Sequence, residues 1–102
     1  MRVKLRCRIS AGQFSSEYAV VVRSHDGREF SLFAQTGDVT YSEQPTADRE
    51  VDGWIKVELL QQDKNLVLVR LPQTTLENGQ FLSVRADQLD RLPEKQKATE
   101  PL

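Results

Sequence analysis

Four basic side chains near the N-terminus have a spacing that could bind anions. Arg2, Lys4, Arg6 and Arg8 alternate with apolar residues, so in a β-strand all four would point to one face. Side chains on one face of a strand lie about 7 Å apart, close to the spacing of phosphates in an extended nucleic-acid backbone. These four residues, here called the basic row, favour a surface that binds phosphates or other anions.

The basic row also has a structural interpretation. Acidic residues on neighbouring strands, such as Glu17, Glu29 or Glu58, could pair with it and leave a solvated, neutralised face. A row of charges also protects an edge strand from aggregation. Two observations separate the interpretations: whether the basic row is salt-bridged in the fold, and whether an aromatic side chain is exposed beside it.

Aromatic residues are few, with four Phe, two Tyr and one Trp. Stacking against bases would need an exposed ring close to the basic row. Phe30 and Phe81 belong to apolar segments, so we expect both in the core. Trp54 follows a glycine at the expected start of a strand. Trp54 is therefore the preferred candidate for an exposed aromatic that contacts a partner, because Trp is enriched at binding surfaces.

Two residues offer the beginnings of catalytic chemistry. His25 precedes Asp26, and a carboxylate can orient an imidazole for acid-base catalysis. The same residues are typical of a tight turn, and the chain has no second histidine. Cys7 lies on the apolar side of its segment, where burial raises the pKa of a thiol and makes it unreactive. We therefore expect neither residue to be catalytic.

Carboxylate pairs occur at Glu50 with Asp52 and at Asp87 with Asp90. Either pair supplies too few oxygen ligands for a calcium site. The chain has no phosphate-binding glycine loop, no nucleophile elbow, no His-Glu-x-x-His and no Cys-x-x-Cys. The sequence therefore predicts a protein that is not an enzyme, with no metal site and no cofactor.

The composition is that of a folded protein of average polarity. Of 102 residues, 38% are hydrophobic and 28% are charged, and the net charge is -1. A near-neutral chain is not typical of a general polyanion binder. One cysteine cannot form an internal disulfide, and charges interrupt the apolar residues at the N-terminus. We expect a cytoplasmic protein with no membrane contact.

Up to seven segments have the pattern of β-strands, at residues 2–10, 17–23, 30–35, 39–42, 55–59, 66–71 and 81–84. Asp26-Gly27 and Asn78-Gly79 predict hairpin turns. The nearly continuous apolar run at 66–71 predicts a central strand covered on both faces. Gly53 marks the restart of regular structure after an acidic loop at 43–52. No segment repeats another.

These elements predict an all-β fold, a small five- to seven-stranded barrel or rolled antiparallel sheet with one short helical turn near residues 86–89. The outline is similar to that of SH3-like barrels, which carries no implication for function. We expect one domain over residues 1–92 and a disordered polar tail over 93–102.

The function expected from these features is that of a non-catalytic binding or protein-interaction module. The basic row and the acidic loop would form two oppositely charged surfaces, which suit docking onto a protein partner or self-association. The alternative is weak, sequence-tolerant binding of RNA or single-stranded DNA through the basic row. The candidate site is therefore the basic row together with Trp54.

Overall fold

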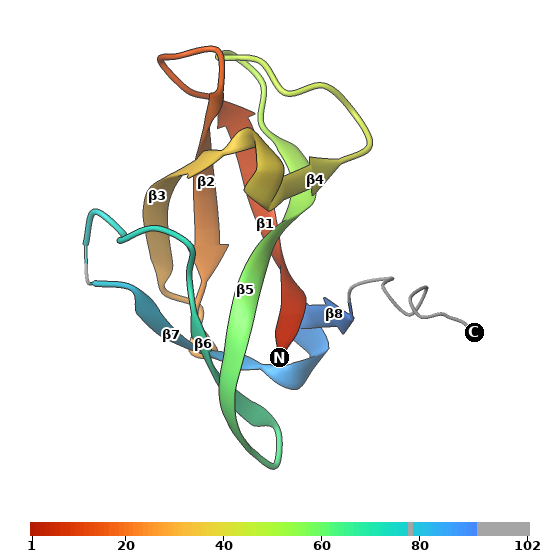
Figure 1. Cartoon of the computed structure of the whole chain (residues 1–102), viewed down its shortest axis with the longest axis vertical. Coiled ribbons are helices and arrows are strands. Elements are labelled where there is room, and N and C mark those ends of the chain that lie inside the picture. The colour runs from red at the N-terminus through yellow and green to blue at the C-terminus, as the bar shows by residue number, and fades with distance from the viewer. Residues whose placement is uncertain (78, 92–102) are drawn as a thin grey trace.

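The computed structural model describes residues 1–77 and 79–91, which form strands and two short 3₁₀ turns (Figure 1). The expected tail at 93–102 and residue Asn78 lie outside the described residues. The elements are β1 (Arg2–Ala11), β2 (Glu17–Arg23), β3 (Glu29–Gln35), η1 (Thr36–Asp38), β4 (Val39–Tyr41), β5 (Val51–Asp63), β6 (Leu66–Arg70), β7 (Phe81–Arg85), η2 (Ala86–Gln88) and β8 (Leu89–Arg91).

The strands form one antiparallel sheet that curls strongly into a half-barrel (Figure 1). The order along the sheet is β3-β2-β1-β5-β6-β7, with β4 paired to β5 and β8 paired to β1. β5 is long enough to pair first with β1 and β4 and then with β6, and its ladder with β6 shifts register between Leu59 and Gln61. Such a bulge increases the local bend of a strand. The expected all-β class is confirmed.

The core is built from alternate residues of the strands. In β1 the buried residues are Val3, Leu5, Cys7 and Ile9, as the period of two predicts. The pair Leu5 and Ile55, from β1 and β5, lies fully buried at the middle of the sheet. Because register slips turn every side chain over, the burial of these four residues places the basic row on the outer face of the half-barrel.

The fold contains an internal repeat that the sequence analysis did not detect. The first half runs β1, β2, β3, η1, β4 and the second runs β5, β6, β7, η2, β8 in the same order. β8 pairs with β1 by placing Leu89 opposite Leu5, and β4 pairs with β5 by placing Val39 opposite Ile55. Leu5 and Ile55 are 50 residues apart in the chain, and so are Val39 and Leu89. A shift of 50 residues therefore relates one pair to the other. The two halves therefore exchange their last strands about a pseudo-two-fold axis at the Leu5–Ile55 pair.

The prediction for the apolar run at 66–71 was wrong in one respect. β6 does lie between β5 and β7, but only one of its faces is covered. Val67 and Val69 are buried, whereas Leu66 is 45% exposed and Leu68 is half-buried. The reason is that the sheet is a single curled layer, so its outer face meets solvent.

Gly53 does not mark the point where regular structure resumes after the acidic loop, because β5 already begins at Val51. A side chain at this position would overlap the Thr40 carbonyl and the side chain of Ile9. The glycine therefore lets β4 and β1 approach β5 closely from both sides.

The turn predicted at Gly27 fits the structure, whereas the hairpin tip predicted at Asn78-Gly79 is not tested, because Asn78 lies outside the described residues and residues 71–80 join β6 to β7. Gly27, at the tip of the β2–β3 hairpin, and Gly79 both have positive φ, a conformation that favours glycine. The helical turn expected near 86–89 is the 3₁₀ turn η2, and a further strand, β8, follows it. That strand was not expected, because its three residues carry no alternating apolar pattern and form a strand only by pairing with β1.

Candidate functional site

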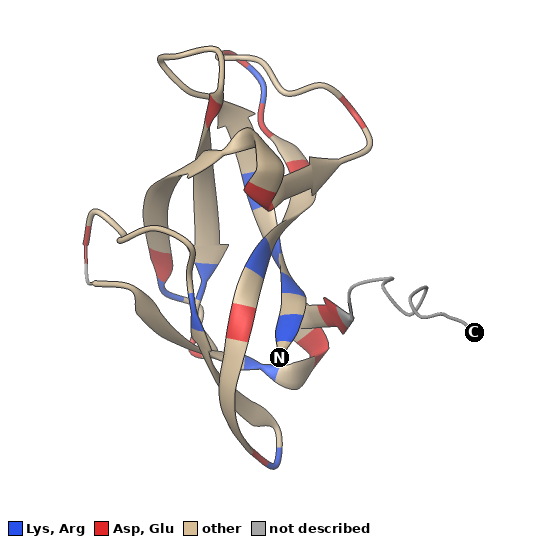
Figure 2. Ribbon diagram, viewed as in Figure 1, with Lys and Arg blue, Asp and Glu red and all other residues tan. Residues whose placement is uncertain are grey.

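The basic row lies on the outer face of β1, directly beside β5. Lys and Arg gather along β1, whereas β5 carries both signs of charge (Figure 2). Across the ladder, Arg2 faces Glu58, Lys4 faces Lys56, Arg6 faces Trp54 and Arg8 faces Asp52. Directly opposed residues of an antiparallel pair lie close enough for their side chains to interact. The basic row is thus flanked at both ends by acids, with two cations facing each other in between.

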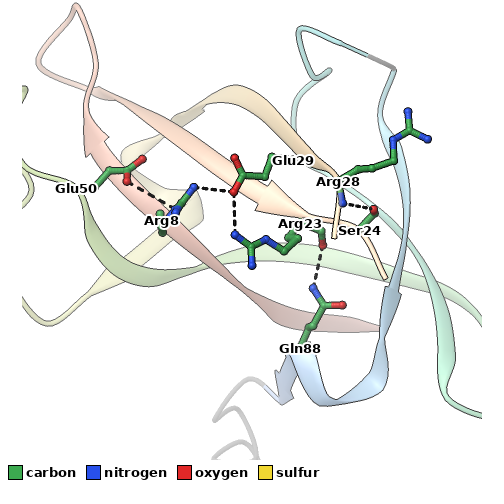
Figure 3. A network of polar contacts seen from close by, with 7 residues as sticks. All are labelled: Arg8, Arg23, Ser24, Arg28, Glu29, Glu50 and Gln88. Atoms are coloured by element: carbon green, nitrogen blue, oxygen red, sulfur yellow. Dashed lines mark hydrogen bonds and ion pairs between the residues drawn. The ribbon is translucent and has the colours of Figure 1, made fainter. Parts of the chain in front are cut away.

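Arg8 is held in an ionic network at one end of the row (Figure 3). Its guanidinium lies 2.9 Å from Glu29 and 3.6 Å from Glu50. Glu29 also accepts a hydrogen bond of 2.8 Å from Arg23. This bond, together with the charge of Arg8, lowers the pKa of the Glu29 carboxyl. Arg8 is therefore compensated, as the structural interpretation of the basic row predicts.

The middle of the row is compensated much less. Within residues 1–77 and 79–91, no acidic side chain forms an ion pair with Arg2, Arg6 or Lys56. Glu58 faces Arg2 but pairs with Arg70. Among the described residues, the basic row is therefore salt-bridged at Arg8, whereas Arg2 and Arg6 have no ion-pair partner.

Trp54, the candidate for an exposed aromatic, lies among these cations and is half-buried. The Lys4 ammonium lies over its ring at 5.1 Å from the ring centre, a cation–π contact. Its indole N–H donates a hydrogen bond of 2.8 Å to Asp90 of β8. Lys4, Arg6, Trp54 and Lys56 therefore form one cluster on the β1–β5 ladder, here called the central quartet.

Beside Arg6 the sheet opens into a shallow pocket of about 350 Å³. On this edge of β1, Lys4 pairs with β8 and Arg8 pairs with β2, so Arg6 lies in the gap between the two ladders. Gln88 partly fills the gap, and its side-chain amide donates a hydrogen bond of 2.8 Å to the Arg23 carbonyl (Figure 3). The lining includes four arginines against two acids: Arg6, Arg8, Arg23, Arg85, Glu29 and Asp52.

The pseudo-two-fold axis relates this pocket to a second one beside Lys56, of about 310 Å³. There β5 passes from β4 to β6, as β1 passes from β8 to β2 in the first pocket. The Arg70–Glu58 ion pair occupies this second gap. Among the described residues, the second pocket is lined by three cations, Arg2, Lys56 and Arg70, against two acids, so its excess of positive charge is smaller than that of the first pocket.

His25 lies in the turn between β2 and β3, and Cys7 lies in the core. The His25 backbone N–H donates 2.8 Å to the Ser83 carbonyl, while the Asp26 carboxylate accepts a hydrogen bond from the Ser24 hydroxyl and not from the imidazole. That bond lowers the pKa of Asp26. Cys7 is buried, and burial followed by the charge of Asp52 raises the pKa of its thiol to about 12. The expected burial of Cys7 is confirmed.

The expected carboxylate pairs are separated by their partners. Glu50 contacts Arg8, Asp87 contacts Arg85 and Asp90 binds Trp54. Across the described part of the chain, no group of three or more His, Cys, Asp or Glu side chains is arranged to hold a metal ion. In the same residues, no helix has the length and apolar character needed to cross a membrane.

Sequence reasoning missed several residues that shape the site. Lys56 could have been found, because it alternates with Ile55 and Val57 in an expected strand. Arg23, Arg85 and Gln88 carry no local signal, and Asp90 was considered only as a metal ligand; all four reach the site only when β2 and β8 pair with β1. Phe81, expected in the core, is 56% exposed on β7, whereas Phe30 is buried as expected.

Comparisons with known proteins give no relative that could name the site. No protein-family model matches the chain, and the searches of curated proteins and of solved structures return no match.

Proposed function

We propose that this protein is a non-catalytic interaction module that binds an acidic segment of a protein partner on the outer face of β1 and β5. The observation that carries the proposal is the central quartet. Arg6 and Lys56 have no ion-pair partner among the described residues. Trp54 lies opposite Arg6 and two residues from Lys56 on the same strand. Arg and Trp are the residue types that most often dominate binding energy at protein interfaces.

The distribution of charge supports a short acidic segment over a long polyanion. Asp52 and Glu58 lie at the two ends of the β1–β5 face, and Asp90 lies beside Trp54. A phosphate backbone running along the basic row would pass over these carboxylates, which would repel it. One or two acidic side chains can instead contact the central quartet and enter the pocket beside Arg6 without meeting both ends.

A second candidate remains, the weak and sequence-tolerant binding of RNA or single-stranded DNA. The specific observation in its favour is that Arg2 and Arg6 have no ion-pair partner among the described residues and that the indole ring of Trp54 lies opposite Arg6. Two or three phosphate contacts to a single strand would give a log–log salt slope of about −1.4 to −2. Binding of this kind would depend on charge and not on base sequence.

The test compares Arg6→Glu and Lys56→Glu with the matched control Lys64→Glu, which reverses an exposed cation in the turn between β5 and β6. The probes are a labelled glutamate-rich peptide and labelled single-stranded RNA and DNA, titrated at low salt. We expect the peptide to bind the wild type and the control and to bind both quartet variants about tenfold more weakly, as the loss of a charged contact predicts.

Three results would decide against the proposal. Tighter binding of the nucleic acids than of the peptide would favour the second candidate. Equal binding of the peptide by all four proteins would show that the central quartet is not the binding surface. A concentration-dependent dimer that the quartet variants abolish would show that the face binds a second copy of the chain.

A further inference from the structure

Strand β3 has one free edge, and at Phe33 the backbone of this edge is unpaired. The backbone of Ser31, two residues earlier, faces the same edge. Its N–H donates a hydrogen bond of 2.7 Å to the Glu77 carboxylate, and its carbonyl accepts one of 2.7 Å from the Leu76 N–H. Backbone groups alternate between the two edges of an antiparallel strand, so those of Phe33 point the same way as those of Ser31. Within the described residues no hydrogen bond outside the β2–β3 ladder involves them.

Exposed apolar side chains surround this free edge. Phe14 and Leu76 are each 68% exposed and Phe33 is 41% exposed. Phe14 and Phe33 line a shallow hollow of about 310 Å³ together with Gln73, and Leu76 is tied to β3 through Ser31. A cluster of large exposed apolar residues marks an interaction surface, whereas single ones are ordinary.

The charge around the hollow is of one sign. Among the described residues that line it, Glu17 is the only ionisable side chain, and the Glu77 carboxylate lies at the adjoining part of the edge, where it accepts a hydrogen bond from the Ser31 N–H. The described part of the lining contains no Lys or Arg. A segment that binds here is therefore favoured by a basic side chain near its apolar ones.

The internal repeat shows that this open edge is not imposed by the backbone. The residue related to Phe33 by the shift of 50 is Ser83 of β7. Its carbonyl accepts a hydrogen bond of 2.8 Å from the His25 N–H, so the β2–β3 turn covers that edge. Where one half of the fold has a covered edge with a small polar residue, the other half has an uncovered edge with an aromatic one.

We propose that the edge of β3 at Phe33 binds an extended segment of a partner protein as an added β-strand. The segment is apolar at alternate positions, so that its side chains contact Phe14, Phe33 and Leu76, and it carries Lys or Arg to face Glu17. Backbone hydrogen bonds supply the affinity in such strand addition and alternate side chains supply the specificity. This surface is separate from the central quartet, and its test does not depend on the proposed function.

The experiment selects binders to the full-length protein from a library of random linear heptapeptides, followed by titration of the selected peptides as synthetic, labelled probes. Three variants are compared. Phe33→Thr removes the ring and keeps the N–H, while Phe33→Pro also removes the N–H, which proline tolerates at a free edge. Phe81→Thr is the matched control, because it removes an aromatic ring that is 56% exposed on β7.

We expect the selected peptides to alternate apolar and polar residues and to include Lys or Arg. They should bind Phe33→Thr about tenfold more weakly than the wild type, bind Phe33→Pro more weakly still, and bind Phe81→Thr normally. Protection of the Phe33 amide from hydrogen exchange on peptide addition would support strand pairing directly, even if Phe33→Pro failed to fold.

Other results would overturn the proposal. These are selected peptides that bind Phe33→Thr and the wild type equally, or an unprotected Phe33 amide in the peptide complex. The absence of any enriched peptide would also count against it. Self-association of the wild type that Phe33→Thr abolishes would assign the edge to a second copy and not to a partner segment.

Discussion

The buried thiol of Cys7 makes a quantitative prediction about stability at alkaline pH. Burial, and to a lesser extent the charge of Asp52, raise the pKa of this thiol from 9.0 to about 12. The unfolded chain loses the thiol proton near pH 9, whereas the folded protein keeps it. The folded state therefore binds more protons between these values, and its stability falls as the pH rises through this interval.

The size of the effect follows from the two pKa values. A single group contributes up to about 1.4 kcal/mol per pH unit between its unfolded and folded pKa. Between about pH 8 and about pH 10.5, Cys7 should therefore cost about 2 kcal/mol of unfolding free energy. Tyr41 adds a loss in the same direction, because its hydrogen bond with Tyr18 raises the pKa of its phenol.

A matched variant isolates the contribution of Cys7. Val57 occupies the position related to Cys7 by the internal repeat and is buried. Cys7→Val therefore introduces the residue type that the core already contains at the equivalent position. Urea unfolding of both proteins, with a reductant present, gives the free energy of unfolding at each pH. We expect the variant to lose about 2 kcal/mol less than the wild type over this interval. Equal losses in the two proteins would refute the reasoning, because Cys7 would then titrate alike in both states.

Three further predictions concern single positions. Gly53→Ala should destabilise by about 2 kcal/mol in thermal or urea unfolding, because the added methyl group overlaps two neighbours, whereas Gly37→Ala, which meets open space, should not. Gly27→Ala should cost about 1 kcal/mol, measured in the same way, because φ is +86° at this turn; a neutral result would remove the strain argument. Glu29→Gln should flatten the loss of stability on acidification: its lowered pKa gives stability that is present above the unfolded pKa and lost as the pH falls through the folded value. If the free energy of unfolding fell equally with decreasing pH in the variant and the wild type, the Arg8–Glu29–Arg23 contacts would contribute nothing to stability.

The class of fold and the face of each strand could be predicted from the sequence. In β1 the strict alternation identified Val3, Leu5, Cys7 and Ile9 as core and placed the basic row outside, since the period of two is a local property of the chain. The turn at Gly27 was equally local, because the tight reversal needs a positive φ. These features depend on residues a few positions apart.

The state of each charge in the basic row could not be predicted in the same way. Arg8 is neutralised by Glu29 and Glu50, which reach it from other parts of the chain, while Arg6 is left in the gap between β2 and β8. The alternation that placed both residues on one face makes no distinction between them. The partner of each cation depends on which strands become neighbours.

The same reason explains why the repeat, β8 and the open edge of β3 appear only in the tertiary structure. β8 is a strand because the curl of the sheet brings it to β1, and Ser83 is covered because the β2–β3 turn reaches β7. The residues on each strand determined which side chains face inward. The closure of the half-barrel, which joins segments far apart in the chain, decided which backbone edges and which charges were left without a partner among the described residues.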